Sequence, residues 1–123
     1  MKSLIQLFLL VQFAVFAFAA SAHFGVFSDL DDPGAGTAET VIAVVLLAGL
    51  ALTFTRAADV RPVALAAQGF ALLGTLIGVT LVLTVGPRET FDVVVHLVML
   101  ALLIAGLLVT SRAPRELEHA GLA

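Results

Sequence analysis

The residue types best suited to chemistry meet near the last long apolar stretch of the sequence. His96 is an ionisable residue inside that stretch, and Asp92 precedes it by four positions. Residues four apart lie on the same face of a helix, one turn from each other. The same face continues through Met99, Leu103, Gly106 and Thr110. Small and polar types dominate this face, so we expect it to face protein rather than lipid.

A second histidine, His23, lies at the far end of the first apolar stretch, on one helical face with Gln12, Phe16 and Ala19. In an up-down-up-down bundle the first and last helices are neighbours. That arrangement would bring His23 close to Asp92 or His96. Ionisable residues within membrane-spanning segments are costly and are functional candidates by default. The predicted candidate site therefore consists of Asp92, His96, His23 and Met99, near the outer surface of the membrane.

Three interpretations of this cluster are open. In the structural one, Asp92 accepts a hydrogen bond from His96 and fixes the end of the last helix. In the proton-handling one, His96 is subject to two opposing effects, because burial disfavours its charged form and a nearby carboxylate favours it. In the third, His96 and His23 ligate haem or copper, with help from Met99 or Asp92. The histidine spacing supports ligation only weakly, since the sequence holds no His-x-x-x-His pair.

The elements that must position these residues follow from charge and hydropathy. Hydrophobic residues make up 61% of the 123 positions, and the mean hydropathy is +1.15, whereas soluble domains are roughly 45–50% apolar. Charged residues are absent from positions 3–28, 40–55, 62–87 and 93–111. About 20 apolar helical residues cross the hydrocarbon core, and continuous apolar runs do not suit the alternating strands of a barrel.

The sequence thus predicts an all-α integral membrane fold, a four-transmembrane-helix up-down bundle that forms a single membrane domain over residues 1–123. The expected spans cover about 4–27, 37–56, 62–85 and 90–110, and a polar tail occupies 111–123. Gly86-Pro87 is expected to end the third span, and Glu39 is expected in the first turn of the second span, where a helix tolerates negative charge.

The distribution of Lys and Arg predicts the orientation. One side of the predicted bundle carries Lys2, Arg56, Arg61, Arg112 and Arg115, and the other carries Arg88. The positive-inside rule places both termini in the cytoplasm, so we expect a multi-pass protein of the cell (inner) membrane.

The amino-terminal segment has a second interpretation. Lys2, the apolar stretch from Leu4 to Phe18 and the Ala20-Ser21-Ala22 triplet also resemble a cleavable signal peptide. We favour a retained helix, because the apolar run continues to Phe27 and Gln12 interrupts the region that a signal peptide would keep apolar.

Two features are expected to hold the helices together. Lipid tails are as apolar as leucine, so membrane helices associate through close packing and interhelical hydrogen bonds. Small residues share a face at Ala67, Ala71, Gly74 and Gly78 of the third span, and a similar row begins with Ala14 and Ala17 of the first span. These rows predict packing within the chain or a homodimer face. Gln12 and Gln68, at similar depths, predict an interhelical polar pair or, alternatively, the lining of a solute path.

Composition excludes several classes of function. The sequence has no cysteine, which excludes disulfides, thiol catalysis and cysteine-ligated metals. Six scattered Lys and Arg residues give no nucleic-acid patch. We therefore expect a small structural or accessory protein without catalysis or a cofactor, embedded in the lipid bilayer with other membrane helices, in a homo-oligomer or a larger complex. The alternative is a protein that handles a small ligand, a metal, haem or a proton through Asp92, His96 and His23.

Overall fold

The computed structural model describes residues 1–85 and 89–115 and consists there of four long helices. They are α1 (Lys2–His23), α2 (Pro33–Leu52), α3 (Val60–Thr84) and α4 (Thr90–Arg112). Each is long and apolar enough to cross a membrane, which confirms the prediction of an all-helical protein with four helices that could span a membrane. Gly86-Pro87, Arg88 and positions 116–123 of the predicted tail lie outside the described residues.

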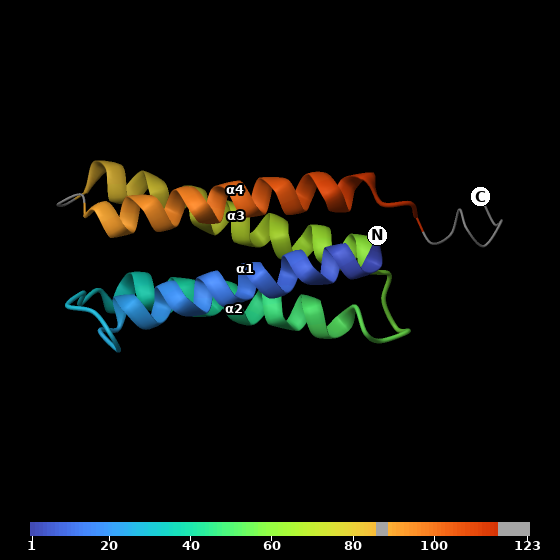
Figure 1. Cartoon of the computed structure of the whole chain (residues 1–123), viewed down its shortest axis with the longest axis horizontal. Helices are drawn as coiled ribbons and strands as arrows, with labels where there is room; N and C mark the ends of the chain where they lie inside the picture. Colours follow the sequence, from blue (N-terminus) through green and yellow to red (C-terminus); the bar gives the residue numbers. More distant parts are fainter. Residues whose placement is uncertain (86–88, 116–123) are drawn as a thin grey trace.

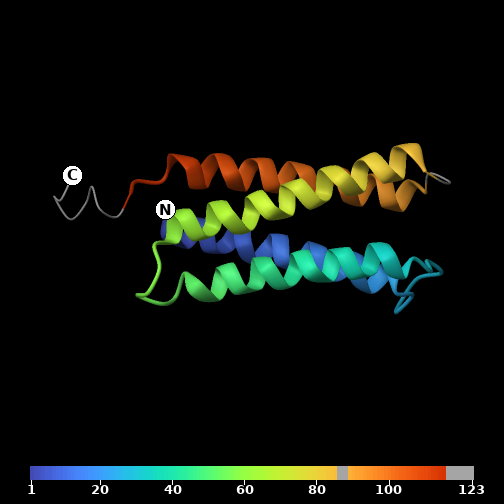
Figure 2. The ribbon, with the colours of Figure 1, turned by 180° about the vertical axis from the view of Figure 1, so that it is seen from behind.

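The helices follow each other around the bundle in chain order, so that each packs against two neighbours. Figure 1 shows that the start of α1, the α2–α3 connection and the end of α4 lie at one end of the bundle, which we call the termini end. The opposite end, which we call the hairpin end, holds the α1–α2 loop, the end of α3 and the start of α4. The view from behind in Figure 2 shows the same arrangement.

Local signals set the helix boundaries. Asp32 caps α2, because its side chain accepts a hydrogen bond from the Ala35 amide at 3.0 Å, and Pro33 follows in the first turn. The helix therefore begins at Pro33, four residues before the expected start. The first helix ends at His23 rather than near Phe27, and the chain turns at Gly25, whose φ of 73° suits glycine.

The interior of the bundle holds both apolar and polar side chains. Its largest fully buried apolar residues are Phe16, Ile5, Leu9, Leu46, Met99 and Leu103. Large apolar side chains also cover the outer surface, for example Leu7, Val44, Leu73 and Leu97. An apolar outer surface is compatible with contact to lipid tails, as in a small multi-pass membrane protein.

Small residues of α3 bring helices close together within the chain. Gly49 of α2 lies so near Ala67 that a Cβ at position 49 would be 2.8 Å from the Ala67 Cβ. Gly74 faces the Ile42 side chain of α2, and Gly78 faces the His96 ring of α4. The small face of α3, which also includes the buried Ala71, thus packs against α2 and α4 of the same chain.

The row expected on α1 is placed differently. Ala14 is exposed and Ala17 is only partly buried. The face that α1 turns to the bundle is instead Gln12, Phe16, Ala19 and His23. The physical reason is that the amide and the imidazole find hydrogen-bond partners inside the bundle, which hydrocarbon cannot offer.

Candidate functional site

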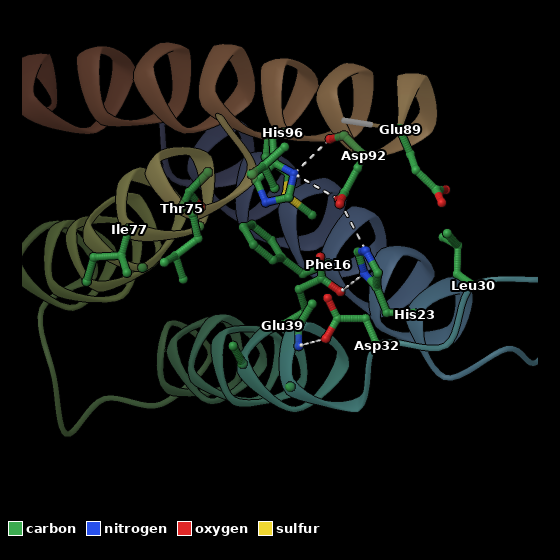
Figure 3. Close-up of a pocket in the computed structure, with 18 of the residues that line it drawn as sticks. Phe16, His23, Leu30, Asp32, Glu39, Thr75, Ile77, Glu89, Asp92 and His96 are labelled. Atoms are coloured by element: carbon green, nitrogen blue, oxygen red, sulfur yellow. Dashed lines mark hydrogen bonds and ion pairs between the residues drawn. The ribbon is translucent and has the colours of Figure 1, made fainter. Parts of the chain in front are cut away.

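Four titratable side chains meet near the hairpin end of the bundle. His23, at the end of α1, lies between Glu39 of α2 and Asp92 of α4 (Figure 3). The His23 Nδ1 atom is 2.7 Å from Glu39 Oε2, and Nε2 is 3.1 Å from Asp92 Oδ1. His96 Nδ1 is 3.3 Å from the same Asp92 oxygen. We call these four residues the His23 cluster, and it joins α1, α2 and α4 in one chain of polar contacts.

The two contacts of His23 determine how many protons the cluster holds. A neutral imidazole has one N–H, whereas a carboxylate only accepts hydrogen bonds. With both ring nitrogens against carboxylate oxygens, one contact would lack a hydrogen if His23 were neutral and both acids were ionised. Either His23 is an imidazolium that donates twice, or Glu39 or Asp92 is protonated and donates to the ring. Both forms contain one additional proton, and they differ only in its position.

His96 is oriented by the backbone of its own helix. Its Nδ1 atom donates to the Asp92 carbonyl oxygen at 2.7 Å, because a carbonyl oxygen can only accept. In the neutral ring this leaves Nε2 as the acceptor. That atom faces Gly78 of α3, where an added Cβ would lie 3.1 Å from it. Gly78 therefore leaves room for the unprotonated nitrogen of His96.

The His23 cluster borders a cavity of about 610 Å³. Apolar side chains of α1, α2, α3 and α4 form much of its wall, among them Phe16, Ile42, Leu81, Val82 and Met99. Acidic residues of the α1–α2 loop and of the start of α4 complete it: Asp29, Asp31, Asp32 and Glu89. No Lys or Arg is among the lining residues in the part of the chain that the structure describes. The cavity is therefore apolar with acidic groups and the two histidines on its wall.

Glu39 has a carboxylate oxygen without a hydrogen bond. The residue is 5% exposed and lines the cavity. Its Oε2 atom contacts His23, while Oε1 is buried and has no partner among the described residues. Since buried polar atoms are nearly always hydrogen-bonded, this oxygen is the feature of the site that most needs a donor.

A second polar layer lies closer to the termini end. Gln12 donates to Gln68 Oε1 at 2.9 Å and to the Leu102 carbonyl oxygen at 3.0 Å. Gln68 in turn donates to the Thr110 hydroxyl at 2.8 Å. Eleven residues separate Gln12 from His23, which is about 16 Å along a helix. This layer joins α1, α3 and α4, and its residues do not line the cavity.

The structure brings the predicted site residues together in part. Asp92 contacts both His23 and His96, which are thereby joined through one carboxylate. Met99 is buried on the cavity wall. Over residues 1–85 and 89–115, no group of three or more His, Cys, Asp or Glu side chains is arranged to hold a metal ion.

The sequence prediction missed the role of Glu39. A second span starting near Thr37 would place Glu39 in the first helical turn, at the membrane surface. With the start at Pro33, Glu39 lies almost two turns into α2 and faces the bundle. The signal was present in the sequence, because Asp32-Pro33 is a typical helix start, and an acid that deep in an apolar helix is a functional candidate.

Comparisons of the chain with models of known families, with curated proteins and with solved structures give no match. The function therefore has to be argued from the chemistry of the His23 cluster and its cavity.

Proposed function

We propose that this small membrane protein handles a proton at a solute-accessible cavity, and that the His23 cluster is the group that takes up and releases it. The observation that carries the proposal is the placement of His23. It is 1% exposed and is bonded through both ring nitrogens to carboxylates of two other helices. Histidine is the side chain best suited to exchange a proton near neutral pH.

Loss of the additional proton would change the packing of the helices. Without it, Glu39 and Asp92 would both be negative around a neutral ring that can donate to only one of them. Uncompensated charge in a buried site is costly, so the deprotonated cluster favours separation of α4 from the α1–α2 hairpin or entry of another cation. The proton is thus linked to the shape and occupancy of the cavity, which is what a proton-coupled binding protein requires.

Histidine NMR of the protein in detergent micelles tests this proposal. We expect the ring signals of His23 to change reversibly between about pH 5 and pH 8. The substitution Asp92→Asn should move this transition, because the His23 ring contacts that carboxylate. Glu89→Gln is the matched control, since it changes an exposed acid three positions earlier on the same side of the cavity. Ring signals that stay constant over this range would refute the proposal.

The accessory role expected from composition is the second candidate, and the outward apolar surface fits other membrane helices as well as lipid. A partner in a complex or a second copy would co-purify in mild detergent. Isolation of a monomer alone, with a functional His23 cluster, would exclude this role.

We propose further that both termini face the cytoplasm across the cell membrane. This rests on the cations at the termini end and on the acids at the hairpin end. The chain has no cysteine, so single cysteines can test it. Leu30→Cys should react with an impermeant reagent from outside intact cells, and Arg115→Cys should not.

A further inference from the structure

We propose that the cavity beside the His23 cluster binds a small organic amine in its protonated form, with an apolar body, and that the ammonium group donates to Glu39. This inference rests on the proposed function and names the class of solute. It is carried by three independent features of the described chain: the buried oxygen of Glu39 without a partner, the sign of the surrounding charges, and the apolar wall.

The ammonium group is placed by Glu39. Its Oε1 atom is buried, lacks a donor and belongs to a residue on the cavity wall. His23 occupies only the other oxygen. A ligand that supplies an N–H to Oε1 would complete the carboxylate, and a charged donor makes the stronger hydrogen bond. A neutral ligand would leave the negative charge of Glu39 uncompensated, and an anionic ligand would add a second negative charge beside it.

The remaining charges favour a cation along the whole cavity. Asp29, Asp31, Asp32 and Glu89 line it together with Glu39 and Asp92, and the only basic side chains among the described lining residues are His23 and His96. Clefts lined by charges of one sign concentrate counter-ions. The described residues hold no group suited to a metal ion, so the cation is better matched by an organic ammonium than by a metal.

The apolar wall determines the rest of the ligand. Phe16, Ile42 and Leu81 line the cavity, and its volume of about 610 Å³ falls within the range of small-molecule sites. An aliphatic or aromatic body would be buried against these side chains while the ammonium group reaches Glu39. A fully hydrated ion such as sodium would gain nothing from this wall.

Binding of the amine is linked to the proton of the cluster. The ammonium group and an imidazolium at His23 are both cations beside Glu39, so they compete. The titratable and charged groups that face His23 and the cavity from the surrounding elements are Glu39, Asp92, His96, Asp29, Asp31, Asp32 and Glu89. The acids far outnumber the histidines among these groups, so their negative charge favours the incoming ammonium. Its entry is expected to release the additional proton of the His23 cluster, while the acidic side chains stay in place.

The experiment measures binding of 2-phenylethylammonium to the full chain in detergent micelles by isothermal titration calorimetry. The neutral isostere 2-phenylethanol and the quaternary phenyltrimethylammonium, which has charge but no N–H, are the comparison probes. We expect the primary amine to bind about tenfold more tightly than either. Equal binding of the amine and the alcohol would overturn the proposal, and so would absence of amine binding.

Two variants separate the role of Glu39 from general charge. Glu39→Gln keeps a side chain that can bond to His23, and we expect it to lose about tenfold or more in amine affinity. Asp59→Asn removes one exposed acid that does not line the cavity, and it should change the affinity by less than about threefold, as for a screened surface charge. Retained affinity in Glu39→Gln, with the helical circular dichroism of the native chain, would refute the site.

Histidine NMR on the same samples distinguishes the two proposals. If the His23 signals respond to pH and the amine does not bind, the amine site is wrong and the proton-handling function stands. If the amine binds and the His23 signals are constant with pH, the proton-handling function is wrong and the cation site stands.

Discussion

The substitution Gly106→Ala tests whether the second polar layer holds the helices together. A Cβ at position 106 would overlap the side chains of Gln68 and Gln12. It would therefore displace three hydrogen bonds: Gln12 to Gln68, Gln12 to the Leu102 carbonyl and Gln68 to Thr110. The absence of a side chain at this position is what lets the two amides lie against α4.

The expected loss of stability follows from these contacts. Interhelical hydrogen bonds in membrane proteins average about 0.6 kcal/mol each, and overpacking of a filled interior costs about 1–3 kcal/mol. Alanine gains about 1 kcal/mol over glycine from helix propensity. Together these effects predict that Gly106→Ala lowers the free energy of unfolding by about 2–4 kcal/mol.

Unfolding by sodium dodecyl sulfate in mixed micelles measures this change. The chain has neither Trp nor Tyr, so energy transfer between dyes on cysteines at positions Lys2 and Arg112 reports the separation of α1 from α4. Gly69→Ala is the matched control, because a Cβ there meets no atom within 4 Å, and it should be neutral or slightly stabilising. A Gly106→Ala protein as stable as Gly69→Ala would refute the reasoning. In a background with Gln12→Ala and Gln68→Ala the penalty at position 106 should vanish.

Three other substitutions test separate parts of the structure. His23→Phe should cost about 3 kcal/mol, because it leaves the buried Glu39 carboxyl without its partner and Asp92 with His96 alone, and adding Glu39→Gln should recover part of the loss in the same unfolding assay. Asp32→Ala should cost about 1 kcal/mol through loss of the α2 cap, with faster amide hydrogen exchange confined to the first turn of α2. Gly49→Val should separate α2 from α3 at Ala67 and cost about 1–3 kcal/mol, whereas the same change at Gly69, tested in parallel, should cost much less.

The fold was largely predictable because it depends on features of short stretches of sequence. Long apolar stretches without charge favour helices long enough to span a membrane, and the short connections between them leave little choice of neighbours. The inward face of α4, with His96, Gly106 and Thr110, also followed from helical spacing, because polar and small residues have few alternatives to facing protein.

The site was predictable where it depends on spacing along one helix, or on the first and last helices of the bundle being neighbours, which places His23 beside Asp92. The relation between Asp92 and His96 is a spacing of four along α4. The partnership of His23 with Glu39 depends on where α2 begins, and an error of four residues there moves Glu39 from the first turn of the helix to a buried position almost two turns further in. The direction of the small face on α1 depended on competition between alanine packing and the hydrogen bonds of Gln12 and His23, which residue spacing alone does not resolve.

The polar contacts of α1 have a consequence for biosynthesis. His23 can pair with Glu39 as soon as the first two helices are in the membrane, since both belong to the amino-terminal half. Gln12 has no such early partner, because Gln68 and the Leu102 carbonyl are made later. A nascent chain therefore carries an amide without its Gln68 partner until α3 arrives, and without the Leu102 carbonyl until α4 arrives. We expect a chain stopped after Asp59 to be degraded faster in cells than the complete one, and replacement of Gln12 by Leu in the shortened chain to slow that loss, as pulse-chase labelling would show.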